Sequence, residues 1–255
     1  NREHLRGFRL GGRLTLGRGW HLQVHRGHYQ RAPSFFELFG DKGAVIGNAE
    51  LVNEAGRIWD WGVVYRGRSG ARTGLILAEV AFYDNRVENL IRFVQNSQQV
   101  SRPHNIGESA LRGVETRLQL HLVSIIHING SYVYQRAENR SPYSFEYGND
   151  LPSAPRHRLN SRIALHANHS SIHYALSHES RHFLDRANLR SVPERTVHNL
   201  GGDSKLPYEL GLAWEVGNLT NNQVADLWGY PLPGRAYSVS LRYEFSHTTP
   251  FKRSK

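Results

Sequence analysis

The chain has 255 residues, a formal net charge of +10 and 39% hydrophobic residues, and it contains neither cysteine nor methionine. Without cysteine it can hold no disulfide framework and no thiolate metal site, and it has no apolar run long enough for a membrane-spanning helix. The arginines are spread along the chain and form no single stripe, which argues against nucleic acid as a partner. Because Asn1 stands where a native gene product has methionine, we expect a processed product or a fragment.

Segments in which apolar and polar residues alternate recur along nearly the whole chain. This period of two predicts β-strands, whose side chains share a face at every second position. We expect eleven strands, at 6–16, 19–31, 56–66, 72–96, 105–121, 124–136, 156–167, 171–183, 195–204, 207–217 and 234–245. Most are about 10 to 13 residues long, as tilted membrane-spanning strands are. The fourth is longer, and Asp84, Asn85 and Arg86 within it predict a bulge or an extension beyond the membrane.

The joins between these strands alternate between short and long. The short joins are 17–18, 67–71, 122–124, 168–170 and 205–206, and the long joins are 32–55, 97–104, 137–155, 184–194 and 218–233. Membrane β-barrels have this asymmetry, with tight periplasmic turns and long external loops. A soluble sandwich has no reason to sort its loops by length. The fold class that we predict is therefore all-β, as part of an antiparallel up-and-down transmembrane β-barrel.

The two faces of each strand differ in polarity, most clearly in the last one. There, Tyr237, Val239, Leu241, Tyr243 and Phe245 alternate with Ser238, Ser240, Arg242 and Glu244. A sandwich shows the same period, so alternation alone does not decide between the two folds. Aromatic residues gather toward strand ends, as interfacial girdles require. Together with strand length and loop sorting, they favour an apolar face in lipid and a polar face in an aqueous bore.

The odd number of strands has a consequence for the ends of the chain. If the short turns are periplasmic, the last strand ends at Phe245 on the periplasmic side and the first strand starts outside the cell. Single-chain bacterial barrels have even strand numbers, and open sheet edges are costly in lipid. We therefore expect residues 1–245 to be the C-terminal portion of a larger barrel. We expect the basic tail at 246–255 to be disordered.

Several short motifs, in their order and spacing, resemble TonB-dependent outer-membrane receptors. The residues that carry the resemblance are Arg31, Pro33, Glu37, Asn48, Asn105, Gly107, Gly113, Glu115, Asn218, Pro233, Gly234 and Phe245. The sequence departs from the family at Ala49, where a proline is usual, and at Asn53, where the family has Pro before Glu. It also continues past Phe245 and lacks the plug domain and the TonB-contacting box. The family's 22-stranded barrel, halved, gives the eleven strands expected here.

The resemblance implies a receptor in the outer membrane of a Gram-negative bacterium that takes up a scarce metal chelate, such as a ferric siderophore or cobalamin. It implies outer-membrane lipid and lipopolysaccharide as surroundings, TonB as a partner only through the missing plug, no cofactor and no enzymatic activity. Candidate ligand-binding residues in the long loops are Arg140, Tyr143, Phe145, Tyr147, Arg186, Arg190, Trp228 and Tyr230. Loop self-packing is the alternative for the aromatic residues, and lipopolysaccharide phosphates are the alternative partners of Arg186 and Arg190.

Two further functions stay open at this stage, a passive outer-membrane pore and, less favoured, a soluble basic β protein that binds nucleic acid. No catalytic arrangement stands out in the sequence. The chain has fifteen histidines, but a His-x-x-x-His spacing on one strand, such as His21 and His25, separates the side chains by about 13 Å, too far for one ion. We therefore expect no dedicated metal site.

Overall fold

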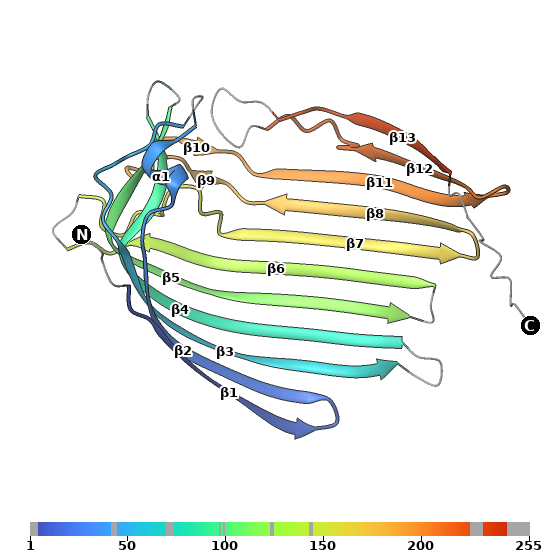
Figure 1. Cartoon of the computed structure of the whole chain (residues 1–255), viewed down its shortest axis with the longest axis horizontal. Coiled ribbons are helices and arrows are strands. Elements are labelled where there is room, and N and C mark those ends of the chain that lie inside the picture. The colour runs from blue at the N-terminus through green and yellow to red at the C-terminus, as the bar shows by residue number, and fades with distance from the viewer. Residues whose placement is uncertain are drawn as a thin grey trace, which may run out of the picture.

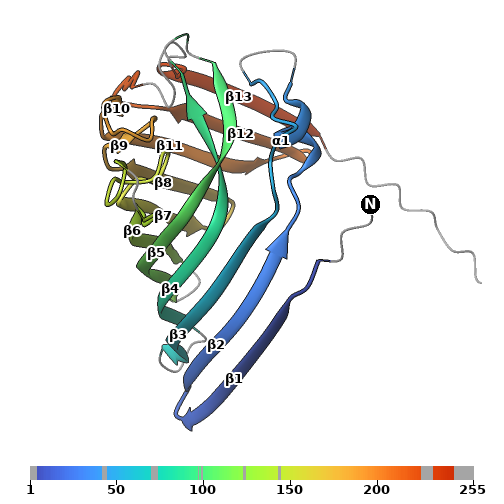
Figure 2. The ribbon, with the colours of Figure 1, turned by 90° about the vertical axis from the view of Figure 1, so that its left-hand side faces the viewer.

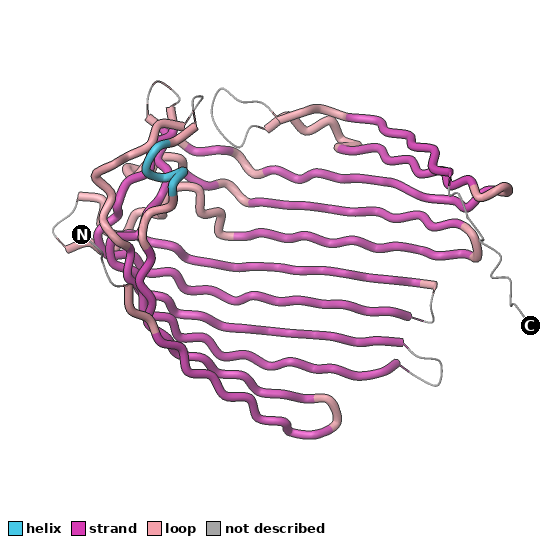
Figure 3. Tube along the Cα trace, in the orientation of Figure 1, coloured by secondary structure: helices cyan, strands magenta, loops and turns pink. Residues whose placement is uncertain are grey.

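The computed structural model describes residues 5–41, 45–69, 74–96, 98, 100–122, 125–142, 145–224 and 232–243. Within these ranges it is almost entirely β-structure (Figure 3). The strands are β1 (Phe8–Gly17), β2 (Trp20–Arg31), β3 (Glu54–Ser69), β4 (Gly74–Gln95), β5 (Ser101–Leu122), β6 (Ile126–Asn139), β7 (His157–Ala167), β8 (Ser170–Glu179), β9 (His182–Phe183), β10 (Ser191–Val192), β11 (Arg195–Leu206), β12 (Leu210–Gly217) and β13 (Ala236–Tyr243), and a short helix, α1 (Phe35–Phe39), follows β2.

Eleven of these strands form one antiparallel sheet, as predicted. Each strand pairs with the next along the chain, and β8 pairs with β11 because the small β9–β10 hairpin lies outside the sheet. The sheet curves strongly but stays open, with β1 at one edge and β13 at the other (Figures 1 and 2). All residues of both edge strands are exposed. The described residues therefore form an open antiparallel β-trough with the predicted strand order.

The two ends of the trough differ as the sequence predicts. The joins after β1, β3, β5, β7 and β11 gather at one end, which we call the turn end, on the right of Figure 1. The longer joins gather at the other end, which we call the loop end. The β1–β2 turn shows why the turns are tight, since Gly17, Arg18 and Gly19 all have positive φ angles. A Cβ atom on Gly19 would lie 2.0 Å from the carbonyl oxygen of Arg66, so only glycine fits there.

The β4–β5 hairpin differs from the prediction. Both strands have 22 residues, and residues 101–104, expected in a long loop, belong to β5. The register runs without a shift from Leu75 to Glu88, so the bulge expected at residues 84–86 is wrong. The strand is continuous there, and its extension beyond the membrane stays a prediction. Residues 101–104 belong to β5 because cross-strand pairing continues through Pro103, opposite Phe93, although a proline usually marks a loop. The hairpin rises above its neighbours at the loop end (Figure 2).

Other strand boundaries also differ from the prediction, since β3 spans Glu54–Ser69 and β6 ends at Asn139, and at two places the join itself is displaced. The eighth strand ends at Glu179, and His182–Phe183 turn away to pair with Ser191–Val192 inside the expected loop 184–194. The β11 strand extends to Leu206, which pairs with Leu210, so the turn lies at 207–209 and not at 205–206. In both places cross-strand pairing, which local residue preferences do not report, sets the end of the strand.

The buried core lies at the loop end and not along the middle of the sheet. Its main cluster consists of Val87, Leu90, Ile106, Ala137, Leu151 and Ala154. By contrast, large apolar side chains at mid-height are exposed, for example Trp61 at 45% and Ile163 at 43%. No helix in the described part of the chain is long and apolar enough to cross a membrane. A sheet with a broad exposed apolar face fits a strand-built surface in contact with hydrocarbon.

Candidate functional site

The loop end is where segments distant in the sequence meet. Three loops fold against the β4–β5 hairpin, and we call them loop A (32–53), loop B (140–156) and loop C (180–194). The Ile46 amide of loop A donates to the Ser101 carbonyl at 3.0 Å, and the Ser153 amide of loop B donates to the Phe183 carbonyl of loop C at 2.7 Å. The Gln95 amide of β4 donates to the Leu184 carbonyl of loop C at 3.3 Å. The loops thus form one connected cap.

Loop A is anchored by an arginine between two buried carboxylates. Arg31, at the end of β2, donates to Glu37 at 2.8 and 3.3 Å and to Glu54 at 3.0 Å. Ser34 caps α1, because its side chain accepts from the Glu37 amide while the Glu37 side chain accepts from the Ser34 amide. Glu54 also accepts from the Ile91 amide of β4 at 3.0 Å. One network therefore joins β2, α1, β3 and β4.

The negative charges of the two glutamates in this network are compensated by nearby arginines and hydrogen-bond donors. Burial would raise the pKa of Glu37, but the hydrogen bonds from Arg31 and Ser34 outweigh it and hold the pKa below the ordinary value. Close by on β4, burial lowers the pKa of Arg92, and the Glu54 carboxylate opposes that shift. A buried carboxylate is tolerated here because each one accepts several hydrogen bonds.

Two asparagines of the predicted motifs hold the rest of loop A to the hairpin. Asn48 is buried, and its Nδ2 donates to the Pro103 carbonyl of β5 at 2.9 Å. Asn105 of β5 accepts from the Val52 amide at 3.0 Å and donates to the Val52 carbonyl at 3.1 Å. Side-chain amides can substitute for a β-ladder in this way because they carry both donor and acceptor. Five of the predicted motif residues are thus found at loop A, either within it, next to it in the chain or in contact with it: Arg31, Pro33, Glu37, Asn48 and Asn105.

The other predicted motif residues lie at separate places. Gly113 sits mid-strand in β5, where a Cβ atom would lie 2.3 Å from the Tyr134 carbonyl oxygen, and at Gly107 it would lie 2.7 Å from Ser141 Oγ. Glu115 is exposed on the polar face of β5. Asn218 is buried after β12 and donates to the Pro233 carbonyl at 3.2 Å. At the adjacent Gly234 a Cβ atom would lie 2.5 Å from Asn221 Oδ1, while Phe245 lies outside the described residues.

The predicted ligand-binding residues of loop B are partly brought together. Arg140 donates to Glu138 and, at 3.2 Å, to the Tyr147 hydroxyl, and its guanidinium lies 5.4 Å from the centre of the Tyr147 ring. The Tyr147 hydrogen bond and the Glu138 carboxylate raise the pKa of Arg140. Phe145, two residues before Tyr147 in the chain, is 88% exposed. Tyr143 lies outside the described residues.

The arginines of loop C have intramolecular partners. Arg186 forms an ion pair with the buried Glu146 of loop B at 2.8 Å, and its carbonyl accepts from Asn149. Arg190 donates to the Asn96 carbonyl beyond β4 at 2.7 Å. These contacts join loop C to loop B and to the hairpin. Trp228 and Tyr230, the other two candidates, lie outside the described residues.

Sequence reasoning missed the acidic partners. Glu54, Glu138 and Glu146 are all buried and each pairs with an arginine. Glu146 and Arg186 are forty residues apart, so no spacing rule predicts their contact. Glu138 lies two residues from both Arg136 and Arg140, and this Arg-x-Glu-x-Arg spacing on one strand face was a signal that could have been used.

Histidines meet on the polar face near the turn end. The rings of His121 and His127 stack with centroids 4.3 Å apart, and His127 lies 4.5 Å from His166. Even so, no group of three or more metal-ligating side chains in the described part of the chain is placed to hold an ion. What the loop end offers instead is a set of exposed aromatic rings and cations on a cap whose loops are hydrogen-bonded to the hairpin or to one another.

Comparison with known proteins agrees with this architecture. The family model described as TonB dependent receptor-like, beta-barrel matches residues 8–247. Among solved structures, the copper transporter OprC superposes with a TM-score of 0.72 at 18% identity, over 94% of this chain and 40% of that one. The siderophore receptor PirA from Acinetobacter baumannii gives 0.68 at 16% identity, over 94% and 41%. A mutant of the ferric enterobactin receptor PfeA from Pseudomonas aeruginosa gives 0.65 at 18% identity, over 92% and 39%. The chain thus spans about two fifths of the length of these proteins.

Proposed function

Because this chain belongs to the TonB-dependent receptor β-barrel family, we propose that it forms part of a receptor in the outer membrane of a Gram-negative bacterium. The family is an outer-membrane family, and the broad exposed apolar face of the trough supports the same location for this chain. In this arrangement the turn end is periplasmic and the loop end faces the outside. Outer-membrane lipid then covers the apolar face.

The substrate class that we propose is a scarce metal chelate, such as a ferric siderophore or cobalamin. The names of the similar solved structures support metal-related cargo, since they include a copper transporter, a siderophore receptor and a ferric enterobactin receptor. The observation that carries the proposal is the hydrogen-bonded cap at the loop end. It presents Phe145 and the Arg140–Tyr147 pair beside loops that are locked to the sheet. Aromatic rings beside cations suit an anionic, aromatic chelate.

In the whole receptor, energy for uptake would come from TonB acting on a plug domain. The strands described here would form part of the barrel wall of that receptor, and the loops at the loop end would form part of its outer surface. A passive pore built from the same strands makes the opposite prediction about energy, which allows a direct test.

Uptake of radiolabelled ferric siderophores, cobalamin and copper should be measured in cells that carry the whole receptor gene and in cells that lack it. We expect one cargo to depend on the receptor, and we expect its uptake to stop when TonB is deleted or the proton gradient is collapsed. Uptake that persists without TonB and follows the external concentration would instead establish a passive pore. Recovery of the receptor in the soluble fraction without detergent would overturn the membrane location.

A further inference from the structure

On the apolar face of β2 to β6, side chains change character in rows toward the loop end. The cross-strand register defines each row, because directly paired residues point to the same side of the sheet. One row is mainly aliphatic and holds Leu22, Val63, Val80, Thr116 and Tyr132. The next row is largely aromatic and holds Val24, Trp61, Phe82, Val114 and Tyr134.

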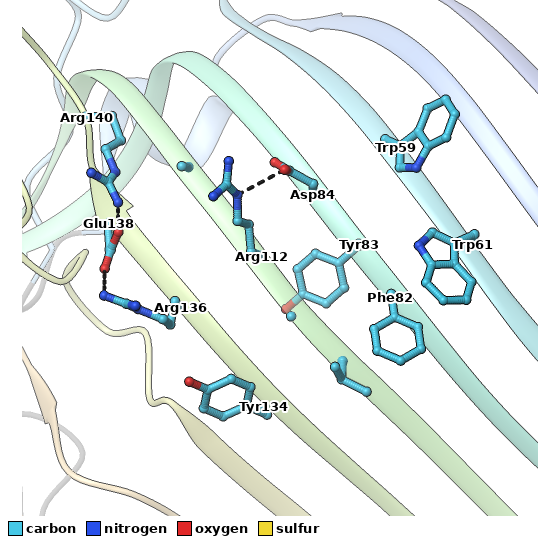
Figure 4. Close-up of a pocket in the computed structure, with 13 residues that line it drawn as sticks. Trp59, Trp61, Phe82, Tyr83, Asp84, Arg112, Tyr134, Arg136, Glu138 and Arg140 are labelled. Carbon is cyan, nitrogen blue, oxygen red and sulfur yellow. Dashed lines mark hydrogen bonds and ion pairs between the residues drawn. The ribbon is translucent and has the colours of Figure 1, made fainter.

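The two following rows are charged. The first contains Arg26, Trp59, Asp84, Arg112 and Arg136, and the second contains His28, Arg57, Arg86, Ala110 and Glu138. Figure 4 shows this change, with the rings of Trp61, Phe82 and Tyr134 on one side and Arg112, Arg136 and Arg140 on the other. An abrupt step from aromatic to charged side chains is the pattern expected where hydrocarbon gives way to headgroups.

We name the five arginines at this step the arginine patch: Arg26, Arg57, Arg86, Arg112 and Arg136. All five are exposed. Arg112 donates its Nε to Asp84 at 3.0 Å, and Arg136 and Arg140 both pair with Glu138. A guanidinium carries five N–H donors, so each of these pairs leaves donors free. The two carboxylates hold the cations in place without using up their hydrogen-bonding capacity.

Arg57 and Arg86 are of particular interest, because they face each other across β3 and β4 and both are exposed. Neither side chain makes a hydrogen bond or an ion pair with any described residue. Two like charges directly opposite on a sheet repel each other and destabilise the pair unless an anion lies between them. The patch also lines three adjoining hollows of about 390, 670 and 640 Å³. Arg112 lies in the walls of the first and second, and Arg57 and Arg86 lie in the walls of the second and third.

We propose that the arginine patch binds the phosphate groups of lipopolysaccharide in the outer leaflet. The proposal deepens the proposed function, since it rests on the apolar face lying in the outer membrane with the loop end outside. Arginine suits this ligand because its planar fork binds two phosphate oxygens at once. The acyl chains would then run along the aliphatic and aromatic rows below, and the sugar groups would lie toward loop B.

Beyond β6 the register shows which row continues. The aliphatic row passes from Tyr132 to Leu159, His178 and Thr196, so His178, which lies 2.8 Å from the Thr196 hydroxyl, is level with that row and not with the arginines. The carboxylates of Glu88 and Glu108 oppose each other one row farther toward the loop end than the arginines, so the row nearest the aromatic rings keeps its positive excess. The phosphate site that we propose therefore lies on β2 to β6, where direct cross-strand pairing defines both charged rows.

The test compares two double variants of the whole receptor, purified from outer membranes. Arg57→Gln with Arg86→Gln removes two patch cations that support no internal contact. Arg13→Gln with Arg117→Gln removes the same charge from exposed positions on the polar face and is the matched control. Binding of lipopolysaccharide, of enzymatically dephosphorylated lipopolysaccharide and of phosphatidylglycerol is measured by native mass spectrometry and by titration in detergent.

We expect the patch variant to lose about tenfold in lipopolysaccharide affinity, while the control stays within about twofold of the wild type. Dephosphorylated lipopolysaccharide should bind the wild type as weakly as the intact lipid binds the patch variant. Equal binding by both variants would overturn the proposal, as would tighter binding of phosphatidylglycerol than of lipopolysaccharide. A receptor that transports normally but shows either of those results would refute the lipid site and leave the proposed function standing.

Discussion

Replacing Arg31 with alanine should release loop A from the sheet. The substitution removes the guanidinium that binds both carboxylates, those of Glu37 and Glu54, whose side chains are only 11% and 6% exposed, and leaves Arg92 close to Glu54. Removing one partner of a buried ion pair typically costs about 3–5 kcal/mol, and the lower figure applies here because the Arg31 side chain is itself 39% exposed. Even the lower figure corresponds to a more than 100-fold increase in the population of the open loop. Because loop A is a local unit, the β-sheet itself should keep most of its stability.

Hydrogen exchange of the receptor in detergent measures this opening directly. The informative amides are those of Asn48, which donates to the Glu37 carbonyl, and Ile91, which donates to the Glu54 side chain. We expect both to exchange at least about 100-fold faster in Arg31→Ala, because exchange follows the population of the open state. Amides in the middle of β6 should be unchanged.

Two further variants serve as controls for this experiment. Arg13→Ala removes an exposed arginine of β1 and should leave both amides as protected as in the wild type. Arg31→Lys keeps the charge but cannot bind two carboxylates through a planar fork, so it should fall between the wild type and the alanine variant. If Asn48 and Ile91 stay within about twofold of the wild type in Arg31→Ala, the anchoring role assigned to this network is wrong.

Three other outcomes follow from the geometry. Protection of the loop A amides against hydrogen exchange should be constant near neutral pH and should fall as the medium is acidified below the ordinary glutamate range. The reason is that the folded-state pKa of Glu37 lies below its unfolded value. Glu37→Gln should flatten this pH dependence in the same exchange experiment. Gly113→Ala places a Cβ atom 2.3 Å from a carbonyl oxygen of β6 and should lower the free energy of unfolding by about 1–3 kcal/mol. Heat-dependent gel mobility should show this as a lower unfolding temperature. Gly130→Ala is the control, because the nearest atom to its Cβ would be 3.9 Å away and alanine should be tolerated. Asn218→Ala removes side-chain hydrogen bonds that close the join after β12 and should speed proteolysis there, while Thr220→Ala, an exposed neighbour, should not.

The sheet could be predicted from the sequence because its signals are local. Alternation and turn residues act within a few positions, and they gave eleven strands in the observed order. The ends of β4 and β5 could not be predicted in this way. Pro103 is a loop signal by its own chemistry, yet it lies inside a strand because the register of the hairpin continues past it and its carbonyl accepts from Asn48. A strand end set by pairing is invisible to any local rule.

The loops were the least predictable part for the same reason. Arg140 and Arg186 were chosen as cations free to meet a ligand, but Glu138 and Glu146 occupy part of their capacity. The motif residues make contacts that the sequence does not name. Asn48 and Asn105, for instance, both join loop A to the hairpin through hydrogen bonds to backbone groups, which no sequence pattern identifies.

The distribution of burial explains which substitutions can report on this fold. Most buried apolar residues, such as Leu90, Ile106 and Leu151, lie at the loop end, and only Val64 and Ala164 are buried at mid-height. At mid-height the sheet must therefore be held by its backbone ladder and by the lipid that we propose around it, because side-chain packing contributes little there. Truncating Ile106 should consequently destabilise the receptor as it would a soluble protein, by about 2–5 kcal/mol. Truncating Ile163, which is 43% exposed on the apolar face, should have an effect that depends on whether the receptor is in a bilayer or in detergent.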